Sequence, residues 1–215
     1  EKNFVVYGVP DGESLPSPKK VYTIPSTGTT TSIGSSCVPS QTTSFPSASY
    51  NTIAGQPSVT LAQINSYLSK NAGMSLQNAG SLFYNLGKQY TIDPAFAIGV
   101  AQAETSLGAS GNTVACNNFF NIKSSPLQTG TCSGNTAFAS FNSVSDGIEA
   151  FYKLISTEYI TNGQNTPAKI GCFPNSGFST HCYCVDTCNS PPFCSSWSQN
   201  VPNFIASVTS TSSAA

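Results

Sequence analysis

Apolar residues recur at helical spacing from about residue 58 onward, which predicts a mainly helical domain. Leu61, Ile64 and Leu68 lie on one face of the first predicted helix, and Thr60 with Gln63 fits a capping box at its start. Similar stripes predict further helices over about 75–90, 143–159 and 197–208.

The segment 93–108 predicts a helix buried on all sides. Asp93 can cap it, Pro94 suits its first turn and Gly108 is a natural stop. The residues between are apolar or small nearly all the way round, apart from Glu104 near the end. Burial would raise the pKa of this carboxyl, as a general acid requires at neutral pH. The alternative is that Glu104 points to solvent from the last turn.

The chain before this domain reads as an extended arm rich in Ser, Thr and Pro, with one possible strand over 3–8. Cys37 lies within the arm and suggests that a disulfide pins it. The predicted division is an arm over 1–56, a helical domain over 57–209 with a Cys-rich insertion over 170–195, and a flexible tail over 210–215.

Composition narrows the class of protein. Charged residues make up 8% of the chain, against about 25% in ordinary soluble domains. A net charge of −1 without any Arg gives no footprint for nucleic acid. No apolar run reaches the roughly 18 residues of a membrane span. Eight cysteines indicate an oxidising compartment, so we expect a secreted or cell-surface protein.

Several short motifs, in order, resemble one known family. Segment 102–108, Gln-Ala-Glu-Thr-Ser-Leu-Gly, is similar to the Gln-x-x-Glu-Ser-Gly-Trp-Gly type motif of bacterial endo-β-N-acetylglucosaminidases and autolysins, which belong to the lysozyme-like superfamily. Segment 117–123, Asn-Asn-Phe-Phe-Asn-Ile-Lys, resembles their Asn-Asn-Leu-Phe-Gly-Ile-Lys. Phe138 to Asp146 and the closing helix with Trp197 continue the likeness, which covers about 58–208.

The resemblance implies a lysozyme-like helical domain that cleaves β-1,4 links in peptidoglycan or a related amino-sugar polymer. Glu104 would then be the acid that protonates the leaving oxygen. The matching positions imply substrate contacts from Asn118, Phe120, Lys123, Phe141 and Trp197. Phe141 and Trp197 fit core packing equally well. The implied reaction needs no cofactor.

The chain also departs from this family. Glycosidases usually use two carboxylates, yet no Asp or Glu occurs between Lys123 and Ser145. Asp146 follows as a capping residue with an expected structural role. Three outcomes stay open: Glu104 acts with help from the substrate, a second acid such as Asp186 contributes, or activity is lost. In addition, Asn121 replaces the family's Gly.

The cysteines are a further difference, because most members of this family have few. Cys116 and Cys132 bracket segment 117–123, and a bridge between them would close a loop worth about 3 kcal/mol in the loop-entropy model. We expect this pair, and expect Cys37 to pair within the cluster from Cys172 to Cys194. The run 181–188 contains His and Cys, but its spacing fits no common zinc site, so no metal is expected.

Two functions of different classes follow from the sequence. The first is a secreted glycosidase of β-N-acetylglucosaminidase or muramidase type that acts on peptidoglycan through Glu104. The second is a lysozyme-like surface or filament-assembly subunit with reduced catalysis, which self-associates when a strand of its arm pairs with a neighbour. The missing second acid favours the subunit, and the intact pattern around Glu104 favours the enzyme.

Overall fold

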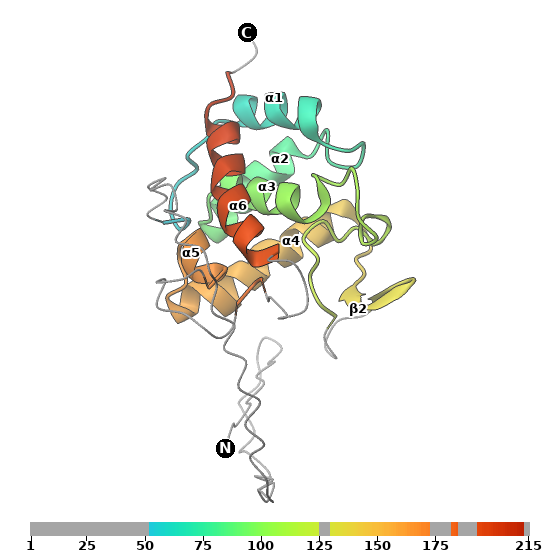
Figure 1. Cartoon of the computed structure of the whole chain (residues 1–215). Coiled ribbons are helices and arrows are strands. Elements are labelled where there is room, and N and C mark those ends of the chain that lie inside the picture. The colour runs from blue at the N-terminus through green and yellow to red at the C-terminus, as the bar shows by residue number, and fades with distance from the viewer. Residues whose placement is uncertain (1–51, 125–129, 173–181, 185–192, 213–215) are drawn as a thin grey trace, which may run out of the picture. The chain divides into compact units, whose positions relative to one another are not determined.

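The computed structural model describes residues 52–124, 130–172, 182–184 and 193–212 (Figure 1). Almost all of the predicted arm over 1–56 and much of the predicted insertion over 170–195 lie outside these ranges, as do Cys37 and Asp186. The described part is mainly helical, which confirms the predicted class. The proposed domain boundaries stay predictions.

Two helices of eleven residues open the described part. Helix α1 (Leu61–Asn71) begins with the predicted capping box, because the Gln63 N–H donates to Thr60 Oγ1 and the Thr60 N–H donates to Gln63 Oε1. Helix α2 (Gly80–Tyr90) begins about five residues later than predicted. The residues before it instead form turns in which the Gly73 carbonyl accepts the Leu76 N–H.

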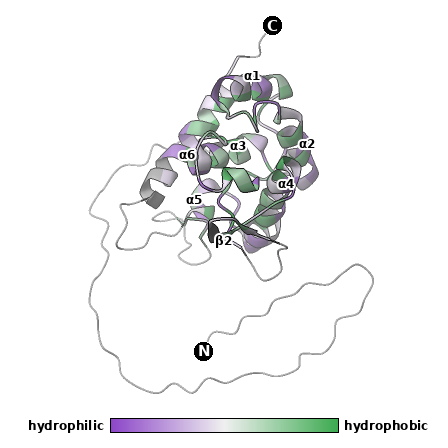
Figure 2. Ribbon diagram, turned by 90° about the vertical axis from the view of Figure 1, so that its right-hand side faces the viewer, coloured by the Kyte–Doolittle hydropathy of each residue, from purple (hydrophilic) through white to green (hydrophobic). Residues whose placement is uncertain are grey.

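Helix α3 (Pro94–Thr105) is the buried helix that segment 93–108 predicts. Asp93 caps it by accepting the Ala95 N–H at 3.0 Å, and the helix ends at Ser106 in the left-handed conformation. Its first eight residues are all buried. Figure 1 shows α3 among the other helices, and Figure 2 shows apolar residues along its ribbon. The rest of the domain therefore folds around this helix.

Helix α6 (Phe193–Thr209) packs along α3 more extensively than any other helix does. Gly99 permits this close approach, since a Cβ there would lie 3.0 Å from Ile205 Cγ1 and 3.2 Å from the Val201 carbonyl oxygen. Among the side chains of α6 that the structure describes, the buried apolar ones follow one stripe: Trp197, Val201, Ile205 and Val208. The predicted closing helix is confirmed, although it begins at Phe193.

Helix α4 (Val144–Leu154) starts at the predicted cap, where Ser143 Oγ accepts the Asp146 N–H. It continues through a π-helical turn (Ile155–Tyr159) and a 3-10 turn (Ile160–Asn162), and the short helix α5 (Pro167–Ile170) follows. Phe151 of α4 stacks on Phe120 with ring centroids 4.0 Å apart. Helix α4 thus anchors the loop that follows α3.

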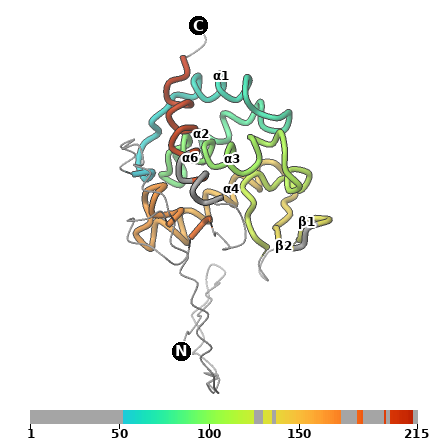
Figure 3. Tube along the Cα trace, in the orientation of Figure 1, coloured from blue at the N-terminus to red at the C-terminus, as the bar shows by residue number. Residues whose placement is uncertain are grey.

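That loop contains a 3-10 turn (Val114–Cys116) and leads to a small antiparallel hairpin of β1 (Thr131–Cys132) and β2 (Asn135–Ala139). Figure 3 shows the two strands side by side. An isolated antiparallel bridge also pairs Lys123 with Phe138 of β2. Along the chain, the 3-10 turn precedes segment 117–123 and the hairpin follows it.

Candidate active site

Glu104 is the penultimate residue of α3, and its carboxylate accepts hydrogen bonds from two other segments. Trp197 of α6 donates its Nε1–H to Oε1 at 3.0 Å. Asn121 donates from Nδ2 to Oε2 at 2.8 Å. The side chain is half-buried and does not extend freely into solvent from the last turn. Both carboxylate oxygens are thus held by neutral donors.

Burial dominates the electrostatics of Glu104 and raises the pKa of its carboxyl above the ordinary value. The hydrogen bonds from Asn121 and Trp197 act in the opposite direction, as does the positive charge of Lys123, because all three favour the ionised form. Since burial outweighs them, Glu104 stays protonated to a higher pH than an exposed Glu. A carboxyl in this state can donate a proton.

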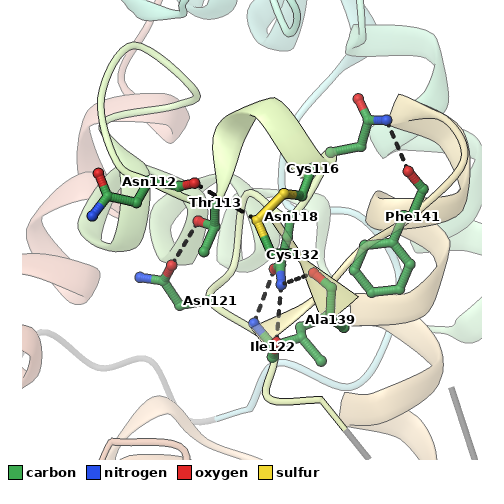
Figure 4. Close-up of a disulfide and its surroundings, with 10 residues drawn as sticks. Asn112, Thr113, Cys116, Asn118, Asn121, Ile122, Cys132, Ala139 and Phe141 are labelled. Atoms are coloured by element: carbon green, nitrogen blue, oxygen red, sulfur yellow. Dashed lines mark hydrogen bonds between the residues drawn. A yellow bond between two sulfur atoms is a disulfide. The ribbon is translucent and has the colours of Figure 1, made fainter. Parts of the chain in front are cut away.

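The contacts of Asn121 with Glu104 and Thr113 could not be seen from the sequence alone. Its backbone has φ of +51°, in the left-handed region that Gly and Asn tolerate best, which accounts for Gly at this position in the resembling family. Its Oδ1 accepts the hydroxyl hydrogen of Thr113 at 2.8 Å (Figure 4). The replacement of Gly by Asn therefore adds a donor to Glu104.

Asn118 is fully buried, and its amide bonds only to backbone groups (Figure 4). Nδ2 donates to the carbonyls of Ile122 and Ala139, each at 2.9 Å, and Oδ1 accepts the Ile122 N–H at 2.9 Å. These bonds join the loop after α3 to strand β2. The predicted substrate contact of Asn118 stays a prediction, and the geometry assigns it a role in shaping the loop.

Cys116 and Cys132 form the predicted disulfide, which closes the same loop (Figure 4). A second bridge joins Cys172 to Cys182. Cys184 is also disulfide-bonded. Cys37 lies outside the described residues, so its pairing within the cluster from Cys172 to Cys194 stays a prediction.

The other predicted contact residues lie in different surroundings. Phe120 is fully buried between Phe83 and Phe151. Lys123 is exposed, with its Nζ 4.2 Å from the centroid of the Phe138 ring. The contacts of Phe120 and Lys123 with a substrate stay predictions. Of the two side chains, that of Lys123 is exposed and that of Phe120 is not.

Phe141 is half-buried, and its backbone carbonyl accepts the side-chain amide of Asn117 at 3.0 Å. Its predicted contact with a substrate stays a prediction.

Trp197 and Tyr183 are two stacked aromatic residues next to Glu104. Trp197 is 1% exposed and stacks on Tyr183 with ring centroids 6.0 Å apart. Its indole therefore packs inside the protein. Tyr183 donates its hydroxyl hydrogen to the Phe120 carbonyl. Burial and the Glu104 charge raise its pKa well above the ordinary value. Sequence patterns gave no signal for Tyr183, which lies in the Cys-rich region.

The other described carboxylates have separate surroundings. Asp93 caps the opposite end of α3, and Glu149 accepts the hydroxyl hydrogen of Tyr90 at 3.0 Å. Asp146 and Glu158 are exposed. Across the described ranges, no group of three or more His, Cys, Asp or Glu side chains could hold a metal ion. Glu104 is thus the described acid whose setting suits proton transfer.

The comparison with protein families defines the class as a glycoside hydrolase of the glucosaminidase type. Residues 80–186 match the sequence model of the family described as mannosyl-glycoprotein endo-beta-N-acetylglucosaminidase, and the chain belongs to this glucosaminidase family. The match includes Glu104, Asn121 and both cysteines of the Cys116–Cys132 bridge. No curated protein sequence matches the chain.

Solved structures of S. aureus autolysin E share the fold. One superposes with a TM-score of 0.55 at 20% identity and covers 74% of this chain and 69% of the autolysin chain. A catalytic Glu-to-Ala mutant of autolysin E, in complex with the disaccharide NAG-NAM, gives a TM-score of 0.55 at 19% identity, with coverages of 74% and 70%. The predicted lysozyme-like fold is consistent with these matches.

Among the described helices, none has the length and apolar character needed to cross a membrane.

Proposed function

We propose that this protein is a secreted endo-β-N-acetylglucosaminidase that hydrolyses peptidoglycan, with Glu104 as its general acid. The observation that carries the proposal is the setting of the Glu104 carboxyl, which is desolvated and held on both oxygens at the end of a buried helix. Its family membership supports the reaction class. The complex of the autolysin E mutant with NAG-NAM supports peptidoglycan as the substrate class.

In the proposed reaction, protonated Glu104 donates its proton to the glycosidic oxygen as the bond from that oxygen to C1 breaks. Asn121 and Trp197 stabilise the carboxylate that remains, because each donates a hydrogen bond to one of its oxygens. The acetamido group of the substrate sugar assists at C1, and water then completes hydrolysis. This route uses one protein carboxylate.

The products of digestion test the proposal. Purified peptidoglycan is incubated with the full chain, and the new reducing ends are reduced with borohydride and identified by mass spectrometry. We expect N-acetylglucosamine at these ends, since the bond broken lies on the C1 side of that sugar. N-acetylmuramic acid at the ends would instead identify a muramidase, and the absence of new ends would overturn the hydrolase proposal.

The same preparation addresses the filament-subunit alternative. A variant without residues 1–8 should release glycan as the full chain does, because the proposed chemistry lies in the helical domain. Fibres that form from the full chain and are lost on this deletion, without any glycan release, would favour the subunit. Electron microscopy of both proteins provides this comparison.

A further inference from the structure

Thr113, Asn121 and Glu104 form a short chain of hydrogen bonds at the end of α3. Thr113 is 2% exposed, and its hydroxyl donates to Asn121 Oδ1 at 2.8 Å. The Asn121 amide then donates from Nδ2 to Glu104 Oε2 at 2.8 Å, and the same nitrogen donates to the Glu104 carbonyl oxygen at 3.3 Å. Thr113 therefore acts on Glu104 only through Asn121.

The two side-chain links of this chain can reverse, whereas the longer bond from Asn121 Nδ2 to the Glu104 carbonyl oxygen is given up when the amide turns. An amide presents either an N–H donor or a carbonyl acceptor when its side chain turns over, and a Thr hydroxyl can donate or accept. With Glu104 ionised, Asn121 donates to it and accepts from Thr113. With a proton on Oε2, the turned amide accepts from Glu104 and donates to the Thr113 hydroxyl.

The donor on the other oxygen makes the arrangement directional. The indole N–H of Trp197 can only donate, and its bond to Oε1 at 3.0 Å keeps that oxygen an acceptor. The proton of Glu104 is thereby directed to Oε2, the oxygen that faces Asn121. In this arrangement each carboxyl oxygen would keep one hydrogen-bond partner whether or not Oε2 carries the proton.

We propose that Thr113 and Asn121 form a two-state hydrogen-bond relay that positions the Glu104 carboxyl in both of its protonation states. Both are positioning residues that act on the proton-donating group without needing to touch the substrate. The inference rests on the proposed role of Glu104 as the acid, which must lose a proton and regain it in every turnover.

The charged and titratable groups that act on Glu104 come from two further segments of the described chain. Lys123, from the loop before the hairpin, favours the ionised carboxylate, and Tyr183 interacts with the Glu104 charge. Neither group belongs to the relay. A change confined to Thr113 leaves both of them, and the Trp197 bond, in place.

The relay predicts how substitutions at Thr113 and Asn121 change the titration of Glu104. The titration is followed by NMR of the Glu104 carboxyl carbon in the full chain without substrate. Asn121→Gly removes the donor while its backbone keeps the left-handed conformation, so the pKa of Glu104 should rise. Thr113→Val should raise it in the same direction, since the amide is then free to turn its carbonyl towards Glu104. Thr113→Ser should retain the wild-type titration.

Asn117→Gly is the matched control, because Asn117 has φ of +54° and its amide bonds to the Phe141 carbonyl. We expect it to leave the titration unchanged. The double variant with Asn121→Gly and Thr113→Val should titrate as Asn121→Gly does, because Thr113 has no other route to Glu104.

A wild-type titration in Asn121→Gly, or a shift of equal size in Asn117→Gly, would overturn the relay. A Thr113→Val effect that persists fully in the Asn121→Gly background would also overturn it. The titration of Glu104 can be measured without turnover. A chain that releases no glycan would therefore count against the proposed function, while the titration would still test the relay.

Discussion

The Trp197 indole donates its Nε1–H to Glu104 Oε1 at 3.0 Å, joining two residues that lie 93 positions apart in the chain. The bond links the C-terminal helix α6 to the end of the buried helix α3. The ring stacks on Tyr183 and has 1% of its surface exposed. The predicted sugar contact of Trp197 stays untested, but this bond gives the residue a different role, as a donor to the candidate acid.

Trp197→Phe should therefore lower glycan release, and the main cause should be the lost N–H donor rather than the lost ring volume. Phe keeps an aromatic ring but has no N–H, so the carboxylate loses a donor and the pKa of Glu104 should rise further. The alkaline limb of the pH–rate profile should move to higher pH as kcat falls. Loss of the bond and of ring volume should reduce the free energy of unfolding by about 1–3 kcal/mol.

Tyr183→Phe is the control for that experiment. It lies in the same aromatic cluster and removes a hydrogen bond to the Phe120 carbonyl, leaving both donors to Glu104. An equal shift of the alkaline limb in both variants would show that general packing, and not the indole donor, sets the pH dependence.

Glu104→Gln should raise the melting temperature at neutral pH, and the gain should shrink as the pH falls. The pKa of Glu104 is raised in the folded state, so the stability that its protonation contributes is complete below the ordinary pKa of Glu. That contribution is lost as the pH rises through the raised value. Gln avoids this cost, and a turned Asn121 amide can still pair with it.

Calorimetry of wild type and Glu104→Gln across this pH range measures the difference. Glu158→Gln removes a carboxylate at an exposed site and is the matched control; its melting temperature should stay near that of wild type. A Glu104→Gln gain that is constant from acid to neutral pH would contradict the burial argument.

Removing the Cys116–Cys132 bridge should impair activity before it unfolds the helices. The double variant Cys116→Ala with Cys132→Ala opens the loop between two residues that are 16 positions apart. In the loop-entropy model this lowers the free energy of unfolding by about 3 kcal/mol. The loop carries Asn121, so the site should loosen while far-UV circular dichroism stays helical. Loss of helix and activity together, at the same temperature, would contradict this order. The matched pair Cys172→Ala with Cys182→Ala tests the other bridge.

Asn118→Ala should destabilise the fold by about 2–4 kcal/mol, because the Ile122 N–H and the Ala139 carbonyl lose a buried partner. Asn142→Ala, at an exposed position, should change stability by less than about 0.5 kcal/mol. Urea unfolding measures both variants. A wild-type midpoint for Asn118→Ala, combined with a raised KM, would instead support the substrate contact expected from the family resemblance.

The sequence predicted best where regular periodicity applies. Helix α3 could be recognised from Asp93, Pro94 and an unbroken apolar run, and burial of that run brought Glu104 into a desolvated setting. Ser143 likewise marked the start of α4. These signals are local, because a cap or a stripe depends on neighbours within one or two turns.

The partners of Glu104 could not be predicted in the same way. Asn121 lies in an irregular loop at positive φ, where no periodicity says which way a side chain points. Whether Trp197 offers its ring face or its N–H depends on how α6 crosses α3, and that geometry depends on Gly99 and on side chains from both helices. Tyr183 depends further on the disulfide that holds its segment.

The central claim is that Glu104 supplies the proton for glycan cleavage, and paired measurement of turnover and binding on Glu104→Gln tests it most directly. Release of reducing ends from peptidoglycan gives kcat, and calorimetric titration with the disaccharide NAG-NAM gives Kd. We predict that Glu104→Gln binds the disaccharide about as tightly as wild type while its release falls to background, because Gln keeps the shape but has no proton to donate. Wild-type kcat in Glu104→Gln would contradict the account.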